Sequence, residues 1–166
     1  MITIRPIRES DAPGFRATLD AVCREKRYLA TLVAPPLEKV EAFVNDNVKN
    51  GYAQFVADLD DKIVGGCDAI PADGGRSHLG DLGMGVLAEF RGQGIGKQLL
   101  QATIDKVRES GLEKIELSVY SSNEPAIALY RSLGFVEEGR KRRGRLVEGI
   151  YDDVLVMGLL LSGAPS

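Results

Sequence analysis

Three closely spaced glycines could form a binding site for an anion. Gly92, Gly94 and Gly96 lie in the segment EFRGQGIGKQLL, in which Ile95 and Leu99 begin a helical pattern of apolar residues. A glycine-rich loop at the start of a helix exposes backbone N–H groups at the positive end of the helix dipole, which suits a phosphate. The segment therefore predicts a phosphate-binding loop, and its spacing indicates which kind.

The spacing does not fit either of two common nucleotide loops. In a Walker A loop, Arg91 would stand where the first glycine belongs and Gln98 where the hydroxyl residue belongs. In the dinucleotide fingerprint, Lys97 would stand where the third glycine belongs. The segment instead has the pattern Arg91-x-x-Gly94-x-Gly96, which follows a predicted strand at residues 79–87 and precedes a predicted long helix.

A strand with one bare face is predicted immediately before the loop, in LGDLGMGVL at residues 79–87. Side chains alternate between the two faces of a strand. One face carries Leu82, Met84 and Val86, and the other carries Asp81, Gly83 and Gly85. Bare glycines in a strand mark either a bulge or a place where a ligand approaches the backbone closely.

The loop is expected to open a helix over residues 94–110 that ends before Gly111, and a second strand and helix follow it. KIELSVY alternates apolar and polar residues, which predicts a strand over 114–120. Asn123 is a favourable N-cap and Gly134 a favourable stop, so a short helix is predicted over 123–133.

The rest of the chain is predicted to form strands and helices of the same domain. A chain of 166 residues that is 44% hydrophobic fits one globular domain. We expect an edge strand over residues 2–8 and a helix over 11–28. A second helix is predicted from residue 37 to a left-handed stop at Asn50–Gly51, followed by a hairpin of strands over 52–59 and 63–70 and a strand-rich C-terminal segment over 149–161. The last residues, SGAPS at 162–166, are predicted to be a frayed tail.

Composition argues against several classes of protein. Cys23 and Cys67 are far apart and His78 is the one histidine, so no metal site is predicted. No apolar stretch has the length of a signal peptide or a transmembrane helix, so we expect a cytoplasmic protein with no membrane contact. No G-x-S-x-G motif occurs, which argues against a serine hydrolase.

Two segments together resemble the GNAT superfamily of acyl-CoA-dependent N-acetyltransferases. They are DLGMGVLAEFRGQGIGKQLL and LSVYSSNEPAIALYRSLGFVEEG, and the tail GRLVEGIYDDVLVMGLLL is similar to the closing strand pair of that superfamily. The resemblance implies an α/β (α+β) domain over residues 1–161, with a mixed, mostly antiparallel central sheet flanked by helices. Its central strands, near Met84 and Val119, would splay to admit the acyl-pantetheine.

The resemblance implies transfer of an acetyl group from acetyl-CoA to a primary amine, by direct attack within a ternary complex. The acceptor would be a small molecule, such as an amino acid or a related amine, or a protein N-terminus. A non-catalytic module of the same fold that senses acyl-CoA is the alternative. A homodimer is also considered, because the strand-rich C-terminal segment would be exposed.

One basic cluster, RKRRGR at residues 140–145, stands out against a net charge of −3. Clustered Lys and Arg residues are what phosphate contacts to nucleic acid require. This cluster has no interleaved aromatic residues, so we expect a solvated hairpin, or a contact for the 3′-phosphate of CoA, and no nucleic-acid partner.

The resemblance also assigns residues to acetyl-CoA binding, where backbone N–H groups would hold the pyrophosphate and a strand edge would pair with the pantetheine. They are Met84, Gly85, Val86, Arg91, Gly92, Gln93, Gly94, Ile95, Gly96, Lys97 and Asn123. Two simpler readings stay open: Gly83 and Gly85 could mark only a bulge, and Asn123 could serve only as an N-cap.

Tyr130 is assigned by the resemblance to protonation of the departing thiolate, and Asp81 is the expected base for the amine. Asp81 is one methylene shorter than the glutamate that is commoner at this position, which favours a water relay. Tyr130 could instead be a packing residue, Asp81 a solvated carboxylate, and His78 the base.

Recognition of the acceptor is expected from the first half of the chain. Glu25 and Tyr28 lie at the end of the first predicted helix, and Asp68 lies on the third predicted strand. Carboxylates at these positions could bind a cationic amine. Glu25 also belongs to the charged run REKR, which is typical of a solvated face.

Overall fold

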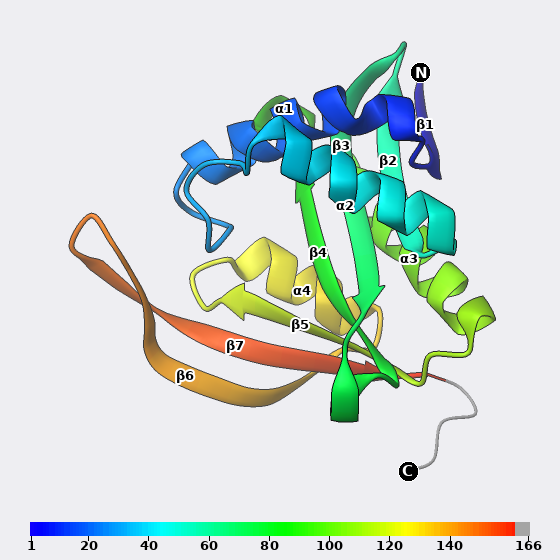
Figure 1. Cartoon of the computed structure of the whole chain (residues 1–166). Coiled ribbons are helices and arrows are strands. Elements are labelled where there is room, and N and C mark those ends of the chain that lie inside the picture. The colour runs from blue at the N-terminus through cyan, green and yellow to red at the C-terminus, as the bar shows by residue number, and fades with distance from the viewer. Residues whose placement is uncertain (162–166) are drawn as a thin grey trace.

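A seven-stranded sheet runs through the computed structural model, which describes residues 1–161 (Figure 1). The strands are β1 (Ile2–Pro6), β2 (Ala53–Leu59), β3 (Lys62–Pro71), β4 (Leu79–Val86), β5 (Lys114–Tyr120), β6 (Val136–Val147) and β7 (Ile150–Leu160). Their order is β1-β2-β3-β4-β5-β7-β6, and every neighbouring pair is antiparallel except β4 with β5. The predicted mixed, mostly antiparallel sheet is confirmed.

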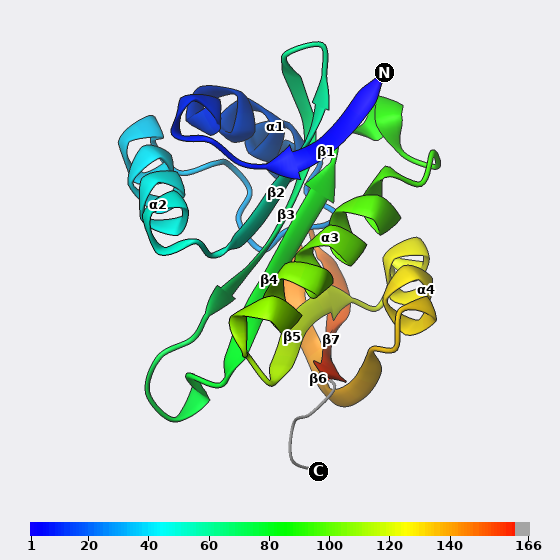
Figure 2. The same cartoon turned by 90° about the vertical axis from the view of Figure 1, so that its right-hand side faces the viewer.

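Helices cover both faces of this sheet. They are α1 (Ala12–Arg24), α2 (Leu37–Asn50), α3 (Ile95–Ser110) and α4 (Glu124–Ser132). Figure 2 shows α1 and α2 on one side of the sheet and α3 and α4 on the other. Within residues 1–161, no helix combines the length and the hydropathy needed to cross a membrane.

The two central strands pair only at one end. β4 and β5 run parallel and are in register at three positions, from Leu79 opposite Lys114 to Asp81 opposite Glu116. Beyond Asp81 the two strands separate (Figure 1). The predicted splay of the central strands is therefore confirmed, and it leaves one edge of β4 open to a ligand.

Apolar side chains anchor the helices in two buried clusters. The larger lies between the sheet, α3 and α4, and Leu99 and Leu100 of α3 are fully buried in it. The smaller lies beneath α1 and α2 and includes Ala12, Val40 and Val44. Because burying each leucine contributes about 1.5–3 kcal/mol, the larger cluster holds the start of α3 firmly against the sheet.

Glycines end two of the helices as predicted, whereas the first helix is shorter than expected. Gly51 and Gly111 follow α2 and α3 with φ angles of 66° and 84°. Such left-handed residues are common helix stops. The first helix ends at Arg24, before the predicted end at residue 28, because Lys26 adopts a φ of 57°, which a helix cannot continue through.

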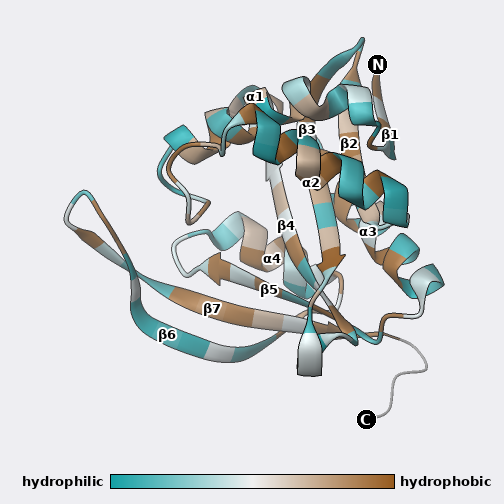
Figure 3. Ribbon diagram, viewed as in Figure 1, coloured by the Kyte–Doolittle hydropathy of each residue, from teal (hydrophilic) through white to brown (hydrophobic). Residues whose placement is uncertain are grey.

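The hairpin of β6 and β7 reaches toward the segment that follows α1. Figure 3 shows β6 as mostly hydrophilic and β7 as mostly hydrophobic, and the basic cluster lies on β6. At the hairpin end, Lys26 forms an ion pair with Glu148 at 2.8 Å, and Arg145 donates a hydrogen bond to the carbonyl of Lys26. The predicted tail at 162–166 lies outside the described residues.

Candidate active site

A cleft of about 800 Å³ opens where β4 and β5 separate. Residues 82–86 of β4 line one side, and residues 118–120 of β5 line the other. The first turn of α3 and one face of α4 also line the cleft, together with residues 28–30, residues 90–92 and 94 of the loop, and Gly144 and Val154 of the β6–β7 hairpin. A cleft of this volume accommodates a ligand of the size of a small-molecule cofactor.

The predicted phosphate loop lies at one end of this cleft. Gly92 and Gly94 have φ angles of 76° and 80°, and Gly94 is the N-cap residue of α3. No side chain caps this end of α3 in the described chain, so the N–H groups of its first turn have no intrahelical acceptor. A Cβ atom at either glycine would meet nothing within 4 Å. Glycine is therefore favoured at positions 92 and 94 by the positive φ angles and not by lack of space. Gln93, between them, is exposed and does not line the cleft.

Gly96 lies in closer surroundings than the two glycines before it. A Cβ atom at Gly96 would lie 3.4 Å from Met84 Cε and 3.6 Å from Leu129 Cδ2. These are ordinary van der Waals distances, so the first turn of α3 packs directly against β4 and α4, with room for a Cβ atom at this position. Lys97, next in the chain, is exposed and lines the cleft.

The side chain of Arg91 connects the loop to the end of α1. Its Nε donates to the carbonyl of Val86 at 2.9 Å, and its terminal nitrogens donate to both carboxylate oxygens of Glu25 at 3.1 and 2.6 Å. Its guanidinium carbon lies 4.5 Å from the centre of the Tyr28 ring. The sequence offers Glu25 either as a contact for a cationic amine or as part of a solvated charged run, and the structure pairs it with Arg91, 66 positions away in the sequence.

Helix α4 and its N-cap bring two further predicted residues to the cleft. Asn123 is the N-cap residue, and its side-chain oxygen accepts a hydrogen bond from the N–H of Ala126 at 3.4 Å. Tyr130 is buried, with its ring centre 5.7 Å from that of Phe135. Burial, together with the neighbouring thiol of Cys67, raises the pKa of Tyr130. Its hydroxyl therefore keeps its proton and can donate a hydrogen bond into the cleft.

Asp81 lies at the paired end of β4, away from the residues that line the cleft. Arg76 holds its carboxylate at 2.7 Å, and about half of the Asp81 side chain is exposed. His78 is exposed in the segment before β4, and its carbonyl accepts a hydrogen bond from the N–H of Glu113. The structure thus brings Tyr130 and Asn123 together at the cleft, and leaves both Asp81 and His78 outside its lining.

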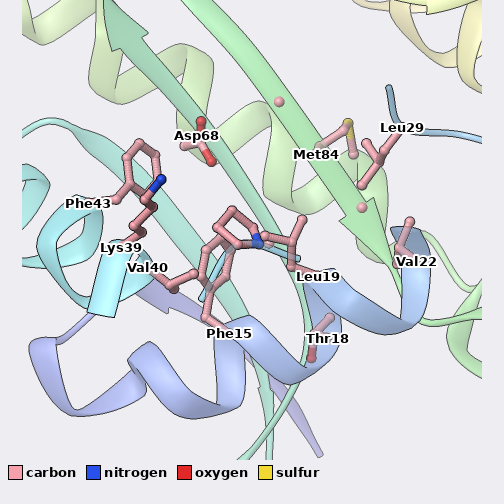
Figure 4. A pocket seen from close by; sticks show the side chains of 14 residues that line it. Phe15, Thr18, Leu19, Val22, Leu29, Lys39, Val40, Phe43, Asp68 and Met84 are labelled. Atoms are coloured by element: carbon pink, nitrogen blue, oxygen red, sulfur yellow. The ribbon is translucent and has the colours of Figure 1, made fainter. Parts of the chain in front are cut away.

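A second cavity, of about 380 Å³, lies between the sheet and helices α1 and α2 (Figure 4). It adjoins the cleft, because both are lined by Val22, Leu29, Gly83, Met84 and Gly85. Asp68 of β3 also lines the second cavity, and burial raises the pKa of its carboxyl to about 7. Sequence reasoning named Asp68 only as an acceptor contact, because the strand pattern does not reveal which helices cover it.

Comparison with known proteins identifies the family. The model of the Acetyltransferase (GNAT) family matches residues 19–135, which is more than half of the chain. The chain belongs to the GNAT family. The matched range includes the phosphate loop, the splayed edge of β4, and α4 with Tyr130. The predicted family and its acetyltransferase activity are therefore confirmed.

Relatives and solved structures agree with this assignment. An L-methionine sulfoximine/L-methionine sulfone acetyltransferase from Pseudomonas aeruginosa is 29% identical, over 96% of this chain and 94% of the relative. A ribosomal-protein-alanine N-acetyltransferase structure from Brucella melitensis has a TM-score of 0.87 at 26% identity, covering 96% of this chain and 99% of that chain. The yncA structure from Salmonella typhimurium, solved with acetyl-CoA, has a TM-score of 0.91 at 20% identity, covering 99% and 96%.

Acetyl-CoA is the co-substrate of GNAT acetyltransferases, and the cleft of this GNAT chain suits it. The first turn of α3 offers N–H groups for a pyrophosphate, and the cleft extends from that turn along the open edge of β4. Its volume of about 800 Å³ accommodates an extended ligand arm. Within residues 1–161, no group of three or more His, Cys, Asp and Glu side chains could hold a metal ion.

Proposed function

We propose that this GNAT enzyme transfers the acetyl group of acetyl-CoA to a primary amine of a small molecule or of a protein N-terminus. The observation that carries the proposal is the contact between the two cavities along Gly83, Met84 and Gly85. One cavity suits acetyl-CoA, and the other is large enough for an acceptor. A thioester at their junction would be open to direct attack by an amine in a ternary complex.

The pantetheine arm would pair with the open edge of β4. Leu79 and Leu87 direct backbone groups to the β3 side, since Leu79 accepts from Ala72 and Leu87 donates to Val64. Backbone groups alternate in direction along a strand. Those of Met84 and Val86 therefore point toward the gap beside β5. Since the Val86 carbonyl already accepts from Arg91, both backbone groups of Met84 and the Val86 N–H would bind the pantetheine amides.

The remaining chemistry needs a proton donor for the sulfur and a group that takes the proton of the amine. Tyr130 would donate to the sulfur as the C–S bond breaks, because its raised pKa keeps the hydroxyl protonated. Asp81 was the expected base, and its ion pair with Arg76 restricts it to a role through water. Asn123 would contact CoA or an ordered water while also capping α4.

A thiol-release assay tests the proposal against the alternative of a binding module. The enzyme is mixed with acetyl-CoA and a panel of amino acids, alkylamines, polyamines and a short peptide with a free N-terminus. We expect release of CoA thiol that depends on one class of amine. Tight binding of acetyl-CoA without thiol release with any amine would instead indicate a sensor. One relative is named an L-methionine sulfoximine/L-methionine sulfone acetyltransferase and one similar structure a ribosomal-protein-alanine N-acetyltransferase, which supports including both acceptor types.

A further inference from the structure

The floor of the second cavity is almost free of side chains. In the ladder between β3 and β4, Gly66 lies opposite Gly85 and Asp68 lies opposite Gly83. A Cβ atom at Gly85 would contact Val22 of α1, so this face of the sheet points toward α1 and α2. A Cβ atom at Gly83 would lie 3.7 Å from Asp68 Oδ1. Of these four paired residues only Asp68 carries a side chain, and Met84 is the other residue of β3 and β4 that lines the cavity with one (Figure 4).

The walls of the cavity are apolar (Figure 4). Helix α1, helix α2 and the loop between them contribute the side chains of Phe15, Leu19, Val22, Leu29, Val40 and Phe43. Thr18 also lines the cavity, and its hydroxyl already donates to the carbonyl of Ile63 at 2.6 Å. A bound molecule would therefore find mostly hydrocarbon around it.

Asp68 is a carboxylate without a partner in this apolar setting. No ion pair or side-chain hydrogen bond joins Asp68 to another group within residues 1–161, and burial raises its pKa to about 7. Lys39, exposed on α2, is the only other charged group among the described residues that line the cavity. Ionised carboxylates in apolar surroundings are costly unless a cation pairs with them. An ammonium group on a ligand would supply that cation.

We infer that the second cavity is the acceptor site and takes a primary amine with a large apolar substituent and no carboxylate beside the amine, with Asp68 binding the ammonium group. This inference rests on the proposed function and narrows its substrate class. A volume of about 380 Å³ accommodates a substituent the size of a leucine or phenylalanine side chain.

We expect an acceptor without a carboxylate beside its amine because no arginine is among the described residues that line the second cavity. An α-amino acid carries its carboxylate two bonds from the ammonium nitrogen, so the two carboxylates would lie side by side when Asp68 holds the nitrogen. Like charges this close repel strongly away from water. Proteins usually bind such a carboxylate through the paired donors of an arginine.

Asp68 also stands where the proton of the ammonium can be removed. The proton passes to the Asp68 carboxylate, and the freed nitrogen pair attacks the thioester carbon. A C–N bond forms, the C–S bond breaks, and its electron pair leaves on the CoA sulfur, which takes a proton from the Tyr130 hydroxyl. The nitrogen loses its second proton through water to restore that hydroxyl, and Asp68 releases the first proton to solvent, so the products are a neutral amide and CoA thiol. The two spaces meet along Gly83, Met84 and Gly85, and the two glycines add no side chain between Asp68 and the cleft. The side chains of Val22, Leu29 and Met84 line this junction.

Paired substrates test the substrate class. 2-Phenylethylamine and isoamylamine are phenylalanine and leucine without the carboxylate, and their amines are at least as basic, so a faster rate cannot come from easier deprotonation. We expect kcat/KM to be at least 10-fold higher for each amine than for its amino acid. A tripeptide that begins with phenylalanine is compared with 2-phenylethylamine. Neither carries a carboxylate beside the amine, so a difference in their rates shows whether the site prefers a peptide N-terminus or a small amine.

Variants test Asp68 itself. Asp68→Asn should raise KM for 2-phenylethylamine and lower kcat/KM about 100-fold, while the Kd of acetyl-CoA stays unchanged. In the wild type, kcat/KM should fall as the pH drops below about 7, and Asp68→Asn should lack that step. Asp73→Asn, which changes an exposed carboxylate just beyond β3, is the matched control and should leave both parameters unchanged.

Failure of this inference is distinct from failure of the proposed function. Equal or faster acetylation of phenylalanine and leucine would overturn the acceptor class while leaving the enzyme an N-acetyltransferase. Lys39→Gln adds a second check, since a loss of activity with the amino acids alone would show that Lys39 binds a substrate carboxylate. Binding of acetyl-CoA without thiol release for any amine would overturn the proposed function first.

Discussion

Arg91 and Glu25 join the glycine-rich loop before α3 to the end of α1, the helix that lines the second cavity. Two hydrogen bonds, of 3.1 and 2.6 Å, connect residues 66 positions apart in the sequence. Both side chains are about one-third exposed or less. The position of the loop therefore depends on how α1 packs, and the two substrate sites share one structural connection.

Glu25→Gln should weaken acetyl-CoA binding without touching the ligand directly. An ion pair of this exposure contributes up to about 1 kcal/mol, so we expect the Kd of acetyl-CoA to rise by up to about 5-fold. Calorimetric titration measures it. Glu138→Gln, which removes an ion pair with Lys114 outside the cleft lining, is the control. An equal change in both variants would show that the connection has no specific role.

Gly94→Val should abolish acetyl-CoA binding. Valine at a φ of 80° is strained and would displace the first turn of α3, whose N–H groups are assigned to the pyrophosphate. Gly111→Val is the matched control, because Gly111 has a φ of 84° at the other end of the same helix. Both variants should melt at a lower temperature, and only Gly94→Val should lose binding. If a folded Gly94→Val protein bound acetyl-CoA with unchanged affinity, the loop would not be part of the binding site.

Tyr130→Phe should lower kcat by about 10- to 100-fold, or about 1.4–2.8 kcal/mol of barrier, because it deletes only the hydroxyl. The ring that packs on Phe135 remains, so the melting temperature should change little. Tyr151→Phe on the exposed part of β7 should behave as the wild type. If Tyr130→Phe turned over normally, the tyrosine would be a packing residue and water would protonate the sulfur.

Asp81→Asn, compared with Asp68→Asn, tests which of the two carboxylates acts as the base for the amine. Its ion pair with Arg76 allows only an action through water, so we expect a loss in kcat/KM of under about 10-fold, against about 100-fold for Asp68→Asn. Steady-state rates for both variants with the same amine provide the comparison. The reverse order of the two losses would return the role of base to Asp81.

Asp68 should also make the protein less stable at high pH. Its pKa is raised by burial to about 7 in the folded protein, so between about pH 4 and 7 the folded state binds the proton that the unfolded state has lost. Stability therefore falls as the pH rises through this window. Asp68→Asn should remove that fall, giving a higher melting temperature than the wild type at pH 8 but not at pH 4. If the melting temperatures of Asp68→Asn and the wild type differed by the same amount at pH 8 and at pH 4, burial would not raise the pKa of Asp68.

Local sequence patterns predicted much of the fold, including the strand, loop and helix that line the cleft. Alternation and glycine placement identified the β4 strand, the loop and the helix stop at Gly111, because these features depend on neighbours in the chain. The ion pairs of Glu25 with Arg91 and of Asp81 with Arg76 could not be predicted from such patterns. Arg91 meets Glu25 through packing across the molecule, and Asp68 lies in apolar surroundings only because α1 and α2 cover that face of the sheet.

Acetyl transfer itself is tested most directly by following an isotopically labelled acetyl group. The enzyme is incubated with acetyl-labelled acetyl-CoA and 2-phenylethylamine, and mass spectrometry and thiol titration are applied to the same samples. We predict one labelled N-acetyl product for each CoA thiol released, at a rate that Tyr130→Phe lowers. Thiol release without labelled amide, or bound acetyl-CoA that stays intact with every amine of the panel, would contradict the account.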